Sequence, residues 1–125
     1  QLVAMDVAAD GLLATGSKGF DREACELAVW DVRTMAKRCS RPAFDNTIEA
    51  LRIVPRAPGA TQLVAVSCDA SMRCFGFPDL ELLWEETAAT AAPYTALDVA
   101  AAGGGQAALF AATTAPEVFV WCWCA

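Results

Sequence analysis

Hydrophobic residues along the chain fall into short runs of about four to eight residues, separated by turn-forming residues. Asp10-Gly11, Pro78-Asp79 and Pro116 are examples of these separators. Runs of this length between turns predict strands rather than helices, and Pro93 predicts a linker around residues 88–92. We expect strands near residues 2–8, 12–17, 27–32, 36–40, 48–54, 63–67, 72–77, 80–86, 94–100, 107–113 and 118–124.

The predicted strands repeat with a period of about 46 residues. The first landmark is an alanine that opens each unit, at Ala4, Ala50 and Ala96, which are 46 positions apart. A second landmark is the aromatic residue of the third strand, at Trp30, Phe75 and Trp121. Four strands for every 40 to 45 residues is the period of a propeller blade.

Several predicted strands are apolar on both faces, as in residues 63–66 and 118–121. Such strands need a covering layer on each side, which a stack of sheets provides without helices. The sequence therefore predicts an all-β fold of three consecutive four-stranded blades, a partial β-propeller. The units are residues 1–46, 47–92 and 93–125, and the last lacks its outer strand.

The first unit resembles a WD repeat. Residues 10–17 match its turn and small-residue second strand, and Trp30-Asp31 matches the dipeptide that closes the third strand. The resemblance implies a WD-repeat β-propeller. The other units depart from the pattern, with Phe75-Gly76 and Trp121-Cys122 at the closing position. The chain has no histidine, so the family's Asp-His-Ser-Trp tetrad is incomplete everywhere. Ser67 and Asp69 match two of its positions.

The connection after the second strand is longer in the first unit than in the others. Thirteen positions separate Ser17 from Trp30, against eight from Ser67 to Phe75. We predict an exposed hairpin loop over residues 18–26, and long rim loops are where binding residues concentrate. The candidate partner-binding residues are Lys18, Phe20, Asp21, Arg22, Glu23 and Glu26. Residues 19–33 are also similar to the late blades of the family of WD repeat-containing protein thirty-one, which is linked to cilia.

Composition narrows the function classes. The formal net charge of −6 disfavours nucleic-acid binding, because phosphate backbones repel it. The longest dense apolar run, residues 118–125, is far below the roughly 20 residues that span a bilayer, so no membrane association is expected. All six cysteines sit in or beside apolar strand-like stretches, which predicts free thiols in a cytoplasmic protein.

Candidate chemistry is sparse. Without histidine, Ser-His-Asp and Cys-His nucleophilic sites are excluded. Cys122 and Cys124 do not have the spacing of a zinc site, so we expect no metal. Glu85 and Glu86 do not form an acid–base pair, because neighbouring residues of a strand face opposite sides. Gly103-Gly104-Gly105 lacks the residues of a phosphate loop and predicts a hairpin turn. We expect no catalytic site, no cofactor and no enzymatic activity.

These observations favour a non-enzymatic protein-interaction scaffold within a larger assembly, in the cytoplasm and, from the narrower resemblance, in the cilium or axoneme. The expected partners are other protein subunits and the missing blades of its own propeller, of which residues 1–125 would form the C-terminal part, with about four blades before Gln1. Expressed alone, residues 1–125 are expected to be insoluble, molten or bound to a partner. The alternative is a small self-oligomerising propeller subunit that acts as a glycan-binding module.

Overall fold

Eleven strands and no helix make up the part of the chain that the computed structural model describes, residues 1–20, 22–55, 60–88, 90–103 and 106–123. This confirms the all-β prediction. The strands are β1 (Leu2–Val7), β2 (Leu12–Ser17), β3 (Cys25–Asp31), β4 (Ala36–Phe44), β5 (Ile48–Val54), β6 (Gln62–Ser67), β7 (Ser71–Gly76), β8 (Leu82–Thr87), β9 (Tyr94–Gly103), β10 (Gln106–Thr113) and β11 (Val118–Trp123).

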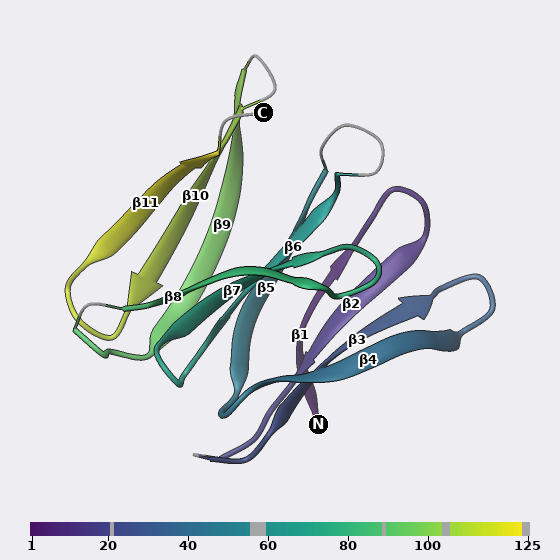
Figure 1. The fold of residues 1–125 in the computed structure, drawn as a ribbon, viewed down its shortest axis with the longest axis horizontal. Coiled ribbons are helices and arrows are strands. Elements are labelled where there is room, and N and C mark those ends of the chain that lie inside the picture. Colours follow the sequence, from purple (N-terminus) through teal and green to yellow (C-terminus); the bar gives the residue numbers. More distant parts are fainter. Residues whose placement is uncertain (21, 56–59, 89, 104–105, 124–125) are drawn as a thin grey trace.

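The strands form three antiparallel sheets in which each strand pairs with its neighbours in sequence. The sheets contain β1–β4, β5–β8 and β9–β11, and they lie side by side with β1, β5 and β9 adjacent (Figure 1). Within the described residues no helix is long and apolar enough to cross a membrane. Gly104 and Gly105 of the predicted hairpin turn lie outside the described residues, but the flanking strands β9 and β10 pair antiparallel.

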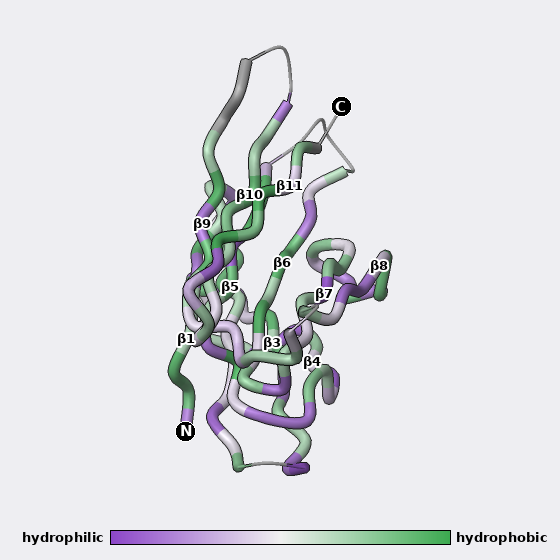
Figure 2. The backbone as a smooth tube through the Cα atoms, turned by 90° about the vertical axis from the view of Figure 1, so that its left-hand side faces the viewer, coloured by the Kyte–Doolittle hydropathy of each residue, from purple (hydrophilic) through white to green (hydrophobic). Residues whose placement is uncertain are grey.

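Strand boundaries differ from the sequence prediction mainly in the outer strand of the first sheet. β4 runs to Phe44 instead of ending near residue 40. Its middle is polar and exposed because an outer strand pairs along one edge only, so hydrophobicity does not mark it. Figure 2 shows the same contrast, with mostly green strands inside the sheets and purple segments on β8.

All three sheets share one register. Each innermost strand carries an irregularity at the same place, between Leu2 and Ala4, between Ile48 and Ala50, and between Tyr94 and Ala96. The repeated aromatics also have equivalent pairing partners on the first two strands of each sheet, and we call each set of three paired residues a row. These rows are Val7–Leu13–Trp30, Ile53–Leu63–Phe75 and Val99–Leu109–Trp121. The 46-residue sequence period is therefore a repeat of backbone geometry.

Every sheet has two faces, because side chains alternate along a strand. We call the side of Ala4, Ala50 and Ala96 the forward face, and the side of the aromatic rows the rear face. The forward face of the first sheet packs on the rear face of the second around Leu27, Val29, Leu51, Leu63 and Phe75. The forward face of the second sheet packs on the rear face of the third around Val64, Val66, Met72, Tyr94 and Leu109.

In the first of these two contacts, Gly16 on β2 packs directly against Ile48. A Cβ atom built on Gly16 would lie 2.6 Å from Cγ2 of Ile48, so only glycine fits at this distance. The two cores explain the strands that are apolar on both faces, since the middle sheet is covered on both sides.

Candidate interaction surface

The β2–β3 loop, Lys18–Ala24, extends from the lower edge of the molecule (Figure 1). Phe20 is 78% exposed, and Lys18, Arg22 and Glu23 are exposed beside it. Asp21 lies outside the described residues. Glu26, predicted as part of this loop, lies in β3 instead, because β3 begins at Cys25. Its carboxylate pairs with Lys37 Nζ of β4 at 2.9 Å.

The base of the β2–β3 loop is fixed to the neighbouring sheet. The hydroxyl of Thr47, just before β5, donates to the carbonyl oxygen of Gly19 at 2.7 Å and accepts the Gly19 N–H at 3.1 Å. Lys18 N–H donates to the carbonyl oxygen of Gln1 at 2.8 Å. Gly19 is buried, and a Cβ there would lie 2.5 Å from Cys25 Sγ. The sequence prediction did not include Thr47, which is 28 residues away along the chain.

The tip of the same loop is a closed turn. Phe20 N–H donates to Glu23 Oε2 at 2.9 Å, and Glu23 N–H donates to the Phe20 carbonyl oxygen at 2.9 Å. Arg22 adopts a left-handed conformation with φ of 64°. The side chain of Phe20 therefore projects from a loop that is hydrogen-bonded at its base and at its tip.

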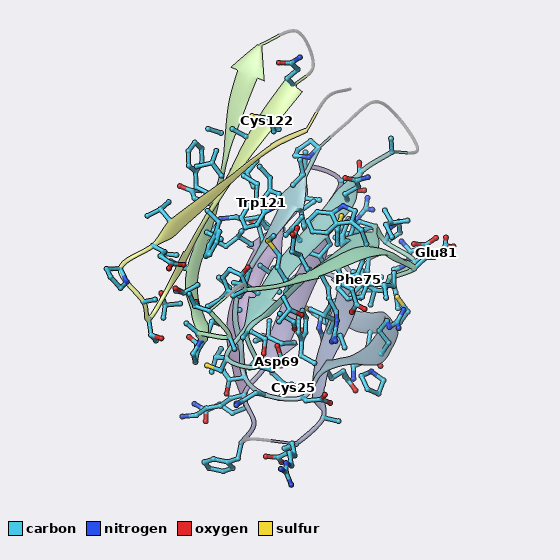
Figure 3. The ribbon with its side chains drawn as sticks, turned by 60° about the vertical axis from the view of Figure 1, so that its left-hand side comes forward. Cys25, Asp69, Phe75, Glu81, Trp121 and Cys122 are labelled. Carbon is cyan, nitrogen blue, oxygen red and sulfur yellow. The ribbon has the colours of Figure 1, made fainter. Side chains whose placement is uncertain are left out.

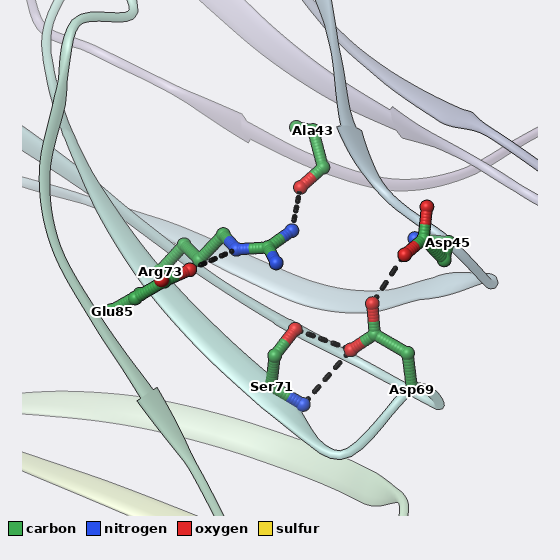
Figure 4. A network of polar contacts seen from close by, with 6 residues as sticks. All are labelled: Ala43, Asp45, Asp69, Ser71, Arg73 and Glu85. Atoms are coloured by element: carbon green, nitrogen blue, oxygen red, sulfur yellow. Dashed lines mark hydrogen bonds and ion pairs between the residues drawn. The ribbon is translucent and has the colours of Figure 1, made fainter.

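A polar network joins the turns of the first two sheets next to this loop (Figure 4). Asp69, in the β6–β7 turn, accepts the Asp45 N–H at 3.0 Å and the Ser71 N–H at 2.8 Å, as well as the Ser71 hydroxyl. Arg73 binds Glu85 at 3.0 Å and donates to the Ala43 carbonyl oxygen. These contacts link β4, β7 and β8 at this edge of the molecule.

The same hydrogen bond extends the pairing of the first two strands in all three sheets. The backbone N–H that follows the second strand donates to the carbonyl oxygen just before the first strand. The pairs are Lys18 to Gln1 at 2.8 Å, Cys68 to Thr47 at 3.0 Å and Thr114 to Pro93 at 2.9 Å. The three acceptors are 46 residues apart, so the repeat includes the loop edge where the candidate site lies.

Trp30 and Asp31, the dipeptide on which the resemblance rests, both have hydrogen-bond partners. Trp30 Nε1–H donates to the buried hydroxyl of Thr15 at 2.9 Å, and the ammonium group of Lys37 lies 5.2 Å from the centre of its ring. Asp31 Oδ1 accepts the Arg33 N–H at 2.9 Å, in the turn to β4. Trp121 instead donates to Glu86 of the neighbouring sheet at 3.1 Å. Sequence reasoning did not assign Thr15 a role.

The thiols of Cys25, Cys39, Cys68 and Cys122 are free, and Cys124 lies outside the described residues. Figure 3 labels Cys25 and Cys122. Burial raises the pKa of Cys68 to about 12, assisted by its 2.8 Å hydrogen bond to the Glu49 carboxylate. Burial also raises the pKa values of Cys25 and Cys39. Within the described residues no group of three or more His, Cys, Asp or Glu side chains is arranged to hold a metal ion.

No protein-family model matches the chain, and no curated protein matches it.

Proposed function

We propose that the chain is a segment of a WD-repeat-type β-propeller and works as a non-enzymatic protein-interaction scaffold. Its three sheets are the blades, and the β2–β3 loop contacts a partner protein within a larger assembly. The proposal is supported by the shared register of the three sheets and by the hydrogen bond that ties Trp30 of the third strand to the Thr15 hydroxyl of the second.

The observation that carries the interaction role is the exposure of Phe20 between hydrogen-bonded residues Gly19 and Glu23. Aromatic side chains supply much of the binding energy at protein interfaces when they enter a pocket on the partner. Ordering a loop on binding costs free energy, and the hydrogen bonds of Gly19 and Glu23 reduce that cost. Phe20 is therefore a pre-positioned anchor.

The charges beside Phe20 define the kind of partner. Lys18, Arg22 and Glu23 are exposed around the aromatic ring, so both signs of charge are present at the rim. An apolar pocket with a mixed polar rim on another protein subunit fits this arrangement. The proposed setting is the cytoplasm, and the similarity of residues 19–33 to a cilia-linked family extends the proposal to the cilium or axoneme.

Affinity capture with three matched baits tests whether the β2–β3 loop binds a partner protein through Phe20. The baits are the wild-type chain, Phe20→Ala, and Met35→Ala, because Met35 is also 78% exposed but lies in the β3–β4 turn. We expect the wild-type chain and Met35→Ala to retain the same partner, and Phe20→Ala to lose it by at least tenfold. Circular dichroism should show that all three baits share one fold.

Equal recovery of every protein by all three baits contradicts the role of the loop. Loss of the partner with both variants contradicts it as well, because a general loss of exposed apolar surface then explains the result.

A further inference from the structure

Two arginines hold reciprocal places in the contact between the first two sheets. The guanidinium carbon of Arg41, on β4, lies 5.5 Å from the centre of the Phe75 ring on β7. The guanidinium carbon of Arg73, on β7, lies 5.0 Å from the centre of the Phe44 ring on β4. The two rings pack edge to face with their centroids 6.4 Å apart. Each sheet therefore contributes one aromatic ring and one guanidinium group to a single cluster.

An irregularity in β4 places Arg41 and Phe44 in this one cluster. Residues three apart in a regular strand face opposite sides, but the pairing of β4 with β3 shifts by one residue at Ala43. Arg41 pairs with Leu27 and so lies on the forward face of the first sheet. Both guanidinium groups therefore lie at the outer edge of the contact between the sheets.

The second contact between sheets carries Glu86 at the position that corresponds to Arg41. Its carboxylate accepts the indole N–H of Trp121 at 3.1 Å, across the contact. Trp121 corresponds in turn to Phe75, whose ring carries no nitrogen or oxygen atom. The first contact therefore gives its charged residue no counterpart of the hydrogen bond that Glu86 makes.

Arg41 is the less paired of the two cations in the cluster. Its Nη1 donates to the Leu80 carbonyl oxygen at 2.9 Å, the residue is half-buried, and no carboxylate within the described part of the chain forms an ion pair with it. Arg73, by contrast, is paired with Glu85 and donates to the Ala43 carbonyl oxygen (Figure 4). Charged side chains that are partly removed from water are normally paired, and the remaining N–H groups of a guanidinium fit the two oxygens of a carboxylate. Arg41 is therefore the cation of this cluster that is available to a ligand.

A cavity of about 260 Å³ opens beside this cluster, between β4 of the first sheet and β7 and β8 of the second. Arg41, Phe75 and Leu82 line it, together with Ala24 of the β2–β3 loop. Pockets that hold drug-sized molecules are larger, roughly 300–1,000 Å³. The size of this cavity therefore fits a single side chain of another protein.

Two carboxylates also line the cavity. Glu85 is paired with Arg73, and Asp45 is exposed to solvent. Their negative charge disfavours a phosphate group, which carries about two charges, more than a carboxylate, which carries one. An acidic side chain can place its carboxylate on Arg41 and its methylene groups against the apolar lining.

We propose that this cavity takes an aspartate or glutamate side chain of the partner protein and that Arg41 binds its carboxylate. The inference deepens the proposed function and rests on it for the occupant, because Ala24 joins the cavity to the loop that carries Phe20. The partner surface then combines an apolar pocket for Phe20 with an acidic residue beside that pocket.

Peptide selection on the 125-residue chain tests this site. Random peptides displayed on phage are selected on the wild-type chain, and those that also bind Arg41→Gln are removed. We expect the remaining peptides to share an aspartate or glutamate. One of them, labelled with fluorescein, then serves as the probe for fluorescence polarisation. Replacement of its acidic residue by the corresponding amide should weaken binding at least tenfold.

Two adjacent leucines of β8 provide matched variants that test where the probe binds. Leu82 and Leu83 are 40% and 45% exposed, and Leu82 lines the cavity whereas Leu83 does not. Leu82→Glu places a negative charge in the cavity and should weaken the probe at least tenfold. Leu83→Glu should leave its affinity within about twofold of the wild-type value, and so should Arg38→Gln, which changes an exposed arginine of β4.

Three results would each overturn the inference: no peptide that depends on Arg41, selected peptides without a shared acidic residue, or equal effects of Leu82→Glu and Leu83→Glu. Circular dichroism checks that the variants are folded. If Arg41→Gln does not fold, peptides selected on the wild-type chain alone are compared on the two leucine variants, which keeps the test intact. Capture of a partner through Phe20 is a separate measurement, so failure of the proposed function and failure of this site are distinguished.

Discussion

The Asp6 carboxylate on β1 accepts a hydrogen bond from the backbone N–H of Ile53 on β5 at 2.8 Å, across the boundary between two sheets. A charged residue recurs at this position in each unit, as Asp6, Arg52 and Asp98. Arg52 and Asp98 form an ion pair with 3.7 Å between Nε and Oδ1, again between adjacent sheets. The charged position of the repeat thus links neighbouring innermost strands.

Replacing Asp6 by alanine should destabilise the fold by about 1–3 kcal/mol, because the Ile53 N–H loses its acceptor in a partly buried place. Chemical denaturation at fixed protein concentration measures this difference. Asp98→Ala is the matched control, and a change below about 1 kcal/mol is expected because its ion pair with Arg52 is exposed. Equal effects of the two substitutions would contradict the role of the Asp6 hydrogen bond.

Sequence alone predicted the strands whose residues pack against another sheet. Trp30, Phe75 and Trp121 were correctly placed in the third strand of each unit, because these aromatics keep the spacing of the repeat. The end of β4 was missed, because an outer strand needs no apolar residues in its exposed middle. The anchoring of Gly19 by Thr47 was also missed, since a contact over 28 residues leaves no local pattern.

Substituting Trp30 by phenylalanine should cost about 1–3 kcal/mol of stability, because the buried Thr15 hydroxyl loses its partner. Trp121→Phe removes a similar aromatic area but frees only the exposed Glu86 carboxylate, so its cost should be clearly smaller. Thermal unfolding of both variants compares them directly. If Trp121→Phe costs as much as Trp30→Phe, ring size rather than the hydrogen bond dominates.

Tyr94 offers a substitution that should not destabilise the chain. Its hydroxyl is buried between the second and third sheets and has no hydrogen-bond partner within the described residues. Burial raises the pKa of this hydroxyl, which therefore stays protonated at neutral pH. Tyr94→Phe removes the unpaired polar atom and keeps the ring contact with Phe119, so stability should stay equal or rise by about 1 kcal/mol. A loss of more than 1 kcal/mol on denaturation would show that the hydroxyl has a partner.

Ionisation of the Cys68 thiol should make the fold less stable at alkaline pH. Its pKa is about 12 in the folded chain, above the value of about 8.5 of an unperturbed thiol. A thiol whose pKa is raised by folding contributes stability that is fully present below its pKa in the unfolded chain. This contribution is lost as the pH rises toward 12. Stability of the wild-type chain should therefore fall more steeply between about pH 9 and 12 than that of Cys68→Ala, whose side chain does not ionise. Parallel curves for the two proteins would contradict this assignment.

The connections that follow the second strand of each sheet differ in length, although the register does not change. Seven residues separate β2 from β3, three separate β6 from β7, and four separate β10 from β11. The hydrogen bond from the residue after the second strand is the same in all three sheets. The length of this connection therefore varies without a change in the register of the sheet. This makes the connection a suitable place for grafting foreign peptide segments. A designer can exchange residues 20–24 for another recognition sequence and keep Lys18, Gly19 and the Gly19–Thr47 contact as the point of attachment.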